Sequence, residues 1–269
     1  MKQHRFSIAV LILALSLVSC QTDGDRINPK TGKTYCQMSD DQYKLAVSAF
    51  SNRQWVQARR YLTRGQEMCP KNERIFYMFG VVAMAEGNRD EALNHFNHAV
   101  ELNEKYSEAR MWQAAVFMDK NDFSTALTIL REVEKDTLYN YPFHVYRNIG
   151  WCQHMLGDNE AAIKYLKKAV FVEDFYCRAW YDLGKIAKEQ NKMDQAVGYF
   201  KNAVRINKRV PAKSCEKFEL AHYELGLLYL QQHDKPLAKE HFKLCSELTS
   251  NVPEHPVHKE CSKMSQLLR

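Results

Sequence analysis

Apolar residues between positions 177 and 210 recur with the 3.6-residue period of an amphipathic helix, with one interruption. The first half places its apolar and small residues on one face: Trp180, Leu183, Gly184 and Ala187. After a polar break at 190–192, a second set shares a face: Ala196, Phe200, Ala203 and Val204. Asn191 lies in the break, where a left-handed backbone is commonly needed and Asn tolerates it. The pattern predicts a helical hairpin, which cannot bury its apolar face alone.

The hairpin pattern recurs along most of the chain. One column of small residues contains Ala58, Ala92, Ala126, Ala162, Ala196 and Ala238, spaced 34, 34, 36, 34 and 42 residues apart. A second column, with the same spacings, contains Ala46, Gly80, Ala114, Gly150, Gly184 and Gly226. A third contains Leu62, Phe96, Leu130, Leu166, Phe200 and Phe242. Because three independent columns agree, we interpret the pattern as a true internal repeat.

The period and the W-x-x-L-G…A…F…A pattern resemble the tetratricopeptide repeat family. The resemblance covers about residues 39 to 252 and implies an all-α fold, a right-handed superhelix of six helical hairpins. The expected repeats are 39–72, 73–106, 107–140, 143–176, 177–210 and 219–252. An insert at 211–218 precedes the sixth repeat, where Ser214 could cap an early helix start. Residues 253–269 are expected to form a capping helix over the last repeat.

The first 19 residues have the features of a signal peptide. Lys2 and Arg5 precede an apolar run at 6–18 that is too short to span a bilayer as a mature helix. Residues 17–20, LVSC, look like the lipobox of bacterial lipoproteins, a resemblance that implies acylation of Cys20, with palmitate as a typical chain. An ordinary secretory signal or a buried helix is the alternative. Gln21 after the cysteine implies, by the same resemblance, the periplasmic face of the outer membrane. Residues 20–38 are expected to form a flexible tether.

Eight cysteines in an exported chain suggest disulfides. Lipidation of Cys20 would leave seven. Antiparallel helices bring their ends together, which makes two pairs disulfide candidates: Cys36 with Cys69, and Cys245 with Cys261. Cys177 and Cys215, near the starts of adjacent first helices, form a weaker candidate, and Cys152 remains unpaired. The alternative is a set of small apolar core thiols.

The charge is unevenly distributed. The net charge is +6, and residues 141–213 hold thirteen basic and seven acidic side chains. This excess indicates either a solvated, mildly basic surface or a docking site for an acidic or phosphate-bearing partner. A nucleic-acid partner is not expected, since the signal segment directs the protein out of the cytoplasm.

The sequence contains no arrangement typical of a catalytic centre. It has no Gly-rich phosphate loop, no nucleophile elbow and no HExxH motif. Two loose clusters, His255–His258–Cys261 and His144–Cys152–His154, are interpreted as structural or surface residues rather than metal ligands. We therefore predict a protein that is not an enzyme, with no cofactor, no metal and no small-molecule substrate.

In the tetratricopeptide repeat family the first helix of each repeat lines the concave face, which implies a groove for a protein partner. The candidate partner-binding residues are Tyr77, Met111, Met118, Arg147, Trp151, Met155, Arg178, Tyr181, Lys185 and Lys188. Aromatic, Met and Arg side chains are enriched in binding patches. Some of these residues are instead expected to pack between helices. Trp151 occupies a position where the family's carboxylate clamps carry Asn, so recognition of a chaperone tail is not implied.

The layout, a short tether followed by six repeats, is similar to that of the pilotins that help type IV pilus secretins assemble. We therefore predict an outer-membrane-anchored periplasmic scaffold that binds a protein partner of the cell envelope. The alternative is an assembly factor or adaptor of outer-membrane barrel insertion or of cell-wall hydrolases.

Overall fold

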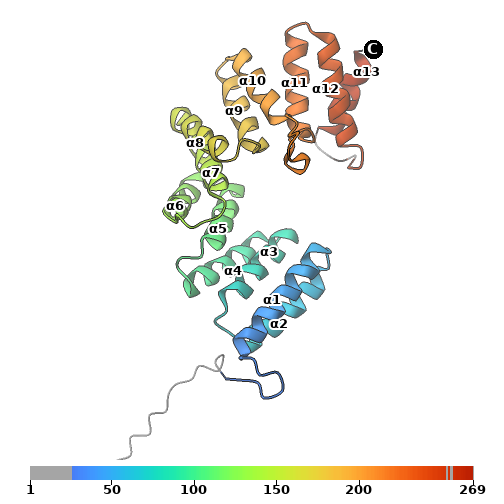
Figure 1. Cartoon of the computed structure of the whole chain (residues 1–269). Coiled ribbons are helices and arrows are strands. Elements are labelled where there is room, and N and C mark those ends of the chain that lie inside the picture. Colours follow the sequence, from blue (N-terminus) through green and yellow to red (C-terminus); the bar gives the residue numbers. More distant parts are fainter. Residues whose placement is uncertain (1–25, 253, 255–256, 269) are drawn as a thin grey trace, which may run out of the picture. The chain divides into compact units, whose positions relative to one another are not determined.

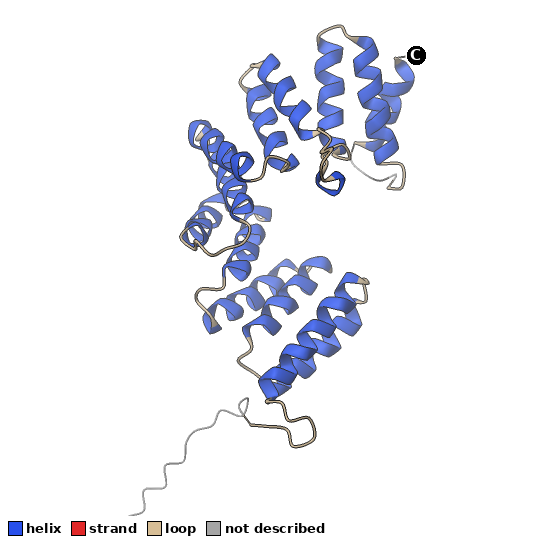
Figure 2. Ribbon diagram, viewed as in Figure 1, coloured by secondary structure: helices blue, strands red, loops and turns tan. Residues whose placement is uncertain are grey.

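The computed structural model describes residues 26–252, 254 and 257–268, so the lipobox with Cys20 and also His255 lie outside the described residues. The described residues contain thirteen α-helices, in keeping with the all-α prediction (Figures 1 and 2). The helices are α1 (Tyr35–Ser51), α2 (Trp55–Met68), α3 (Glu73–Ala85), α4 (Arg89–Leu102), α5 (Ser107–Asp119), α6 (Phe123–Glu134), α7 (Pro142–Met155), α8 (Asn159–Val172), α9 (Cys177–Glu189), α10 (Met193–Ala203), α11 (Glu219–Gln231), α12 (Lys235–Leu248) and α13 (His258–Leu267). None of these helices is both long and apolar enough to cross a membrane.

Hairpins are formed by α1 with α2, α5 with α6, α7 with α8, α9 with α10, and α11 with α12, and α13 packs against α12. The described residues divide into two compact units, with the boundary between Val82 and Ala83. In the first unit, α1 and α2 pack through Ala46, Ala58 and Leu62, all fully buried. A disulfide joins Cys36 to Cys69 across the open end of this hairpin, with the two Cα atoms 4.9 Å apart.

The start of α1 differs from the expected one. The helix begins at Tyr35 rather than Ser39, because Thr34 and Gln37 form a capping box that satisfies two of its first N–H groups. Residues 26–34, expected to belong to the flexible tether, form a closed turn instead. Ile27 pairs with Thr34 in a β-bridge, and the Asn28 N–H donates to the Lys33 carbonyl at 2.8 Å. Local hydrogen bonds therefore order a segment that has almost no apolar residues.

In the second unit, each hairpin closes where a small residue faces a large one. An ideal Cβ built on Gly184 of α9 would lie 2.5 Å from Cε1 of Phe200 in α10. The Cβ positions of Gly150 and Gly226 meet Leu166 and Phe242 in the same way, at 2.9 and 2.8 Å. These are members of the repeat columns found in the sequence, so the columns mark the contact between the two helices of each hairpin.

The turn within the fifth hairpin has the predicted conformation. Asn191 has φ +57° and links α9 to α10. In the first hairpin, Arg53 has the same φ of +57° at the matching turn, which shows that the position imposes a left-handed backbone even on a residue that adopts it less readily.

The insert before the sixth repeat departs from expectation. Ser214 does not cap an early helix, and α11 begins at Glu219. The Ser214 hydroxyl instead accepts a hydrogen bond from the Asn207 N–H at 2.8 Å, and residues 211–213 form a 3₁₀ turn. A disulfide between Cys177 and Cys215 fastens the insert to the start of α9. A third disulfide joins Cys245 of α12 to Cys261 of α13.

We expect Gly184→Ala to destabilise the protein by about 1 to 3 kcal/mol, because the added methyl group would overlap the fully buried ring of Phe200. The matched control is Gly198→Ala in the exposed face of α10, where nothing lies within 4 Å of the new Cβ. The control should be neutral or stabilising by up to about 1 kcal/mol, because Ala is the better helix former. Urea unfolding of both variants tests this, and equal stabilities would contradict the close-contact interpretation.

Candidate protein-binding surface

The exposed faces of α5, α7, α9 and α11, the first helices of their hairpins, are here called the first-helix surface. Beneath this surface, a buried ion pair joins two neighbouring hairpins. Nε of Arg147 in α7 lies 2.5 Å from Oδ2 of Asp182 in α9, and the two side chains are only 11% and 2% exposed. Burial alone would lower the pKa of the guanidinium, but the adjacent Asp182 carboxylate raises the pKa of Arg147 above its usual value. The pair joins the fourth hairpin to the fifth.

Two further contacts extend this row of charges. The Lys188 ammonium group lies 2.6 Å from a carboxylate oxygen of Glu224, which joins α9 to α11. Nε2 of His154 lies 3.4 Å from Glu189. Asp182, Glu189 and Glu224 are not among the residues predicted from the sequence. A signal did exist for the first of these, because Asp182 follows Arg147 by 35 residues, close to one repeat period.

The ion pairs change the chemistry available to a partner. Arg147 and Lys188, two of the four predicted cations, already have carboxylate partners. Arg178 is exposed and Lys185 half-buried, and within the described part of the chain neither has an ion pair. The positive charge offered by α9 is therefore concentrated on these two side chains, one near each end of the helix.

The predicted aromatic residues lie beside these charges. Trp151 is half-buried, and the Arg147 guanidinium lies over its ring at 5.5 Å. The Tyr181 ring packs edge-on against Phe218, with centroids 5.2 Å apart. Burial, followed by the nearby Glu224 carboxylate, raises the pKa of Tyr181 to about 12, so its hydroxyl is a neutral hydrogen-bonding group at neutral pH. Both aromatic residues combine a supported ring with an accessible edge.

The other predicted residues have different surroundings. Met155, at the end of α7, is 44% exposed. Met111 and Met118 of α5 pack against the buried cluster around Ala114 and Leu130, so part of each side chain belongs to the core. Tyr77 is half-buried on α3, in the first unit. Of the predicted residues, Trp151 and Met155 thus lie on α7 and Arg178, Tyr181 and Lys185 lie on α9, and these two helices are joined by the Arg147–Asp182 pair.

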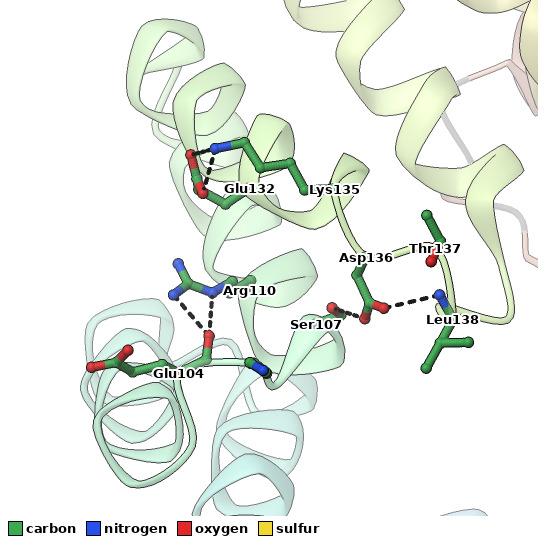
Figure 3. A pocket seen from close by; sticks show the side chains of 9 residues that line it. Glu104, Ser107, Arg110, Glu132, Lys135, Asp136, Thr137 and Leu138 are labelled. Atoms are coloured by element: carbon green, nitrogen blue, oxygen red, sulfur yellow. Dashed lines mark hydrogen bonds and ion pairs between the residues drawn. The ribbon is translucent and has the colours of Figure 1, made fainter.

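A separate hollow of about 590 Å³ lies between the ends of α5 and α6 (Figure 3). Several of its polar groups are paired with one another. Arg110 donates two hydrogen bonds to the Glu104 carbonyl, at 3.0 and 2.9 Å, and Lys135 binds Glu132 at 2.8 Å. The Ser107 hydroxyl donates to Asp136 at 2.5 Å. The hollow contains none of the predicted partner-binding residues.

The loose His and Cys clusters are not assembled into metal sites in the described part of the chain. There, no group of three or more His, Cys, Asp or Glu side chains is placed to hold a metal ion. Cys261 is in a disulfide, and His258 contacts the Thr249 hydroxyl at 2.9 Å. In the other cluster, Nδ1 of His144 contacts the Tyr176 hydroxyl at 2.9 Å, while Cys152 is a buried free thiol.

A histidine pair between α11 and α12 is the most strongly perturbed titratable feature of the sixth hairpin. Nε2 of His222 lies 2.9 Å from the Glu216 carbonyl, and its Nδ1 lies 2.9 Å from Nδ1 of His241. The first contact requires His222 to donate from Nε2, so its Nδ1 accepts the proton of His241. Burial lowers the pKa of both rings, that of His241 to about 4, with further contributions to His241 from His222 and Lys201.

Comparison with known proteins identifies the repeat. The tetratricopeptide repeat family matches residues 77–142, 143–170 and 178–209. This chain is a tetratricopeptide repeat protein. Tetratricopeptide repeats are scaffolds that bind protein partners, and the first-helix surface is where this chain presents aromatic and cationic groups together.

The tetratricopeptide repeat protein is distantly related to type IV pilus assembly proteins. It is 21% identical over 224 residues to the type IV pilus assembly protein PilF of Pseudomonas aeruginosa, covering 83% of this chain and 75% of PilF. Its fold is similar to that of the crystal structure of PilW, a type IV pilus biogenesis factor, with a TM-score of 0.69 and 17% identity over 83% of this chain and 98% of PilW. It also resembles the solved structure of Pseudomonas aeruginosa PilF, with a TM-score of 0.68 and 15% identity over 85% and 98% of the two chains.

The same fold occurs in an unrelated setting. The Cut9–Hcn1 structure of the APC/C has a TM-score of 0.68 with 16% identity over 86% of this chain, which spans only 42% of that chain. At such identities a structural likeness shows the fold alone, so any more specific function depends on surface residues.

We expect Arg147→Ala to lower the free energy of unfolding by about 3 to 5 kcal/mol, because it leaves the Asp182 carboxylate buried without a counter-charge. The double variant Arg147→Met with Asp182→Leu should recover most of this loss. Lys188→Met, at a pair whose lysine is 35% exposed, should cost no more than about 1 kcal/mol. Urea unfolding measures all three, and a double variant as unstable as the single one would show that the pair is not the cause.

The histidine pair predicts a pH dependence with a definite sign. The pKa values of His222 and His241 are lowered in the folded state, so the neutral rings favour folding. The contribution of the two neutral rings to the free energy of unfolding is complete above pH 6.5 and should be lost as the pH falls towards 4. Thermal unfolding between pH 7.5 and pH 4 should therefore show a steeper loss of stability for the wild type than for His241→Phe. His98→Gln, at an exposed histidine, should retain the wild-type slope.

Proposed function

We propose that this tetratricopeptide repeat protein is an outer-membrane-anchored periplasmic scaffold whose first-helix surface binds a protein partner and assists assembly of a type IV pilus secretin. The observation that supports this most directly is the relationship to PilF, which extends over 83% of this chain and 75% of PilF. The match includes the repeats that carry Trp151 and Tyr181, so the relatedness covers the candidate binding region as well as the scaffold.

The geometry favours a particular kind of partner segment. The Trp151 and Tyr181 rings are supported from below by other side chains and can accept an apolar anchor without reorganisation. Arg178 and Lys185 flank them and can meet carboxylates. A segment with an apolar or aromatic anchor beside acidic residues would complement both features. We infer that the aromatic residues provide most of the affinity and that the exposed cations mainly affect association rate.

The proposed periplasmic location rests on the amino-terminal segment. A basic start, a short apolar run and the LVSC sequence support export followed by acylation of Cys20. This location agrees with the three disulfides, which persist in oxidising compartments.

We expect Trp151→Ala combined with Arg178→Glu to reduce capture of the secretin subunit by at least about 30-fold, since loss of a central aromatic anchor typically costs about 2 kcal/mol or more. Crosslinking in intact cells followed by affinity purification and quantification of the secretin measures this. The control, Gln195→Ala combined with Lys164→Glu, changes exposed residues of the second helices α10 and α8 and should capture normally.

Circular dichroism must show that the double variant is folded. A folded double variant that captures the secretin as well as the wild type does would place the binding site elsewhere. Capture of a barrel-insertion subunit or a cell-wall hydrolase in place of the secretin would contradict the pilus assignment.

We expect Cys20→Ala to remove the protein from the outer-membrane fraction, because the variant lacks the residue that would carry the lipid. Mass spectrometry of the wild-type protein should show an acylated cysteine at the mature amino terminus. A wild-type protein without lipid, or a variant that still sediments with outer membranes, would contradict the anchor.

A further inference from the structure

Exposed apolar side chains gather at one edge of the second unit. Several large apolar residues that the structure leaves exposed follow or end the second helices of successive hairpins, and six of them are Leu138, Phe171, Val172, Ile206, Val210 and Val252. Phe171 and Leu138 are 89% and 88% exposed, so almost none of their apolar surface is covered. We call these six residues the loop edge.

The loop edge is one continuous border. Hairpin packing places the loops between repeats at one end and the turns within repeats at the other; Figure 2 shows the α10–α11 and α12–α13 loops opposite the α9–α10 and α11–α12 turns. Contacts link successive members of the border. The Lys168 ammonium group at the end of α8 lies 3.8 Å from Glu134 at the end of α6. Beyond α8, Asp174 binds Arg205 at 2.5 Å.

Positive charge accompanies the apolar residues. Lys167 lies one helical turn before Phe171, and Lys208 and Arg209 lie between Ile206 and Val210. All three cations are exposed and have no ion pair within the described residues. Glu134 and Asp174, acidic residues of the same border, are each neutralised by a basic partner. The edge therefore offers exposed apolar tips close in sequence to exposed cations that have no ion pair within the described residues.

This arrangement fits a bilayer surface better than a folded partner. Protein interfaces concentrate their binding energy in a contiguous, desolvated centre whose anchor residues fill pockets. The exposed apolar side chains of the loop edge instead occur singly or in pairs, one group for each repeat. A fluid lipid interface accepts separate apolar side chains without needing complementary shape, and anionic headgroups attract exposed Lys and Arg.

We propose that the loop edge rests on an anionic phospholipid surface, inserting Phe171 and Ile206 among the headgroups while Lys167, Lys208 and Arg209 contact their phosphates. The contact would orient the second unit on the membrane and leave the first-helix surface available for a protein partner. It does not depend on the type IV pilus assignment, since it concerns a different face of the hairpins.

The test uses the full-length protein purified from membranes, with Phe171→Cys labelled by the fluorophore bimane. Labelling is selective, because burial raises the pKa of the one free thiol in the described residues, Cys152, to about 12. The matched control is Leu156→Cys, 51% exposed at the opposite end of α8. In vesicles of phosphatidylglycerol and phosphatidylcholine containing a doxyl-labelled lipid, the label at 171 should be quenched at least about threefold more than the label at 156.

Charge should contribute to this contact. Lys167→Glu combined with Lys208→Glu should reduce quenching at 171 by at least about half, as should raising the salt concentration to about 0.5 M. Equal quenching at 171 and 156, or equal quenching in vesicles of phosphatidylcholine alone, would overturn the proposal. So would a photocrosslink in cells from position 171 to an envelope protein without quenching by lipid, which would make the edge a protein interface. None of these results depends on whether the secretin is captured.

Discussion

The close approach of two helices within each hairpin is the constraint on which the rest of the structure depends. In the fifth hairpin, Gly184 leaves room for the ring of Phe200, and any larger residue would meet that ring below van der Waals distance. The same relation recurs between Gly226 and Phe242. Because the hairpin closes at this contact, the outward faces of its two helices have fixed directions. One face then becomes the first-helix surface, and the ends of the second helices become the loop edge.

Stacking of hairpins adds a second constraint, which is electrostatic. The fourth and fifth hairpins meet through the buried Arg147–Asp182 pair, where each charge is stable only because the other is present. This contact removes one cation from the surface and supports the Trp151 ring beside it. A partner therefore meets fewer free cations than the basic composition of this region suggests. These cations accompany the Trp151 ring, which the Arg147 guanidinium supports.

The three disulfides lie where the regular repeat is weakest. Cys36–Cys69 closes the first hairpin, Cys177–Cys215 holds the insert before α11, and Cys245–Cys261 fastens α13 to the last hairpin. Terminal hairpins lack a neighbour on one side, and the insert lacks helical hydrogen bonds along much of its length. Covalent links at these points restrict the unfolded chain and offset the missing packing. The hairpins α5–α6 and α7–α8 have no such links and depend on neighbour contacts alone.

Sequence periodicity was sufficient to predict an all-α repeat fold, because helix pairing imposes a small residue and a large residue at fixed positions in every repeat. Columns such as Gly184 and Phe200 record a contact between residues only 16 positions apart, which a local pattern can reveal. The signal and lipobox features are likewise local, and the sequence remains their sole support. Boundaries were less predictable, since the start of α1 depends on a capping box and the role of Ser214 depends on the fold of the insert.

The polar contacts of the candidate surface could be identified only from the tertiary structure. The partners of Arg147 and Lys188 lie 35 and 36 residues away, and nothing local distinguishes a cation that faces solvent from one that faces the carboxylate of the next hairpin. The loop edge was equally hidden, because Leu138, Phe171 and Ile206 resemble ordinary core residues until burial is known. The sequence thus determined which helices form and how each pair closes, whereas stacking decided which charges and apolar side chains remain exposed.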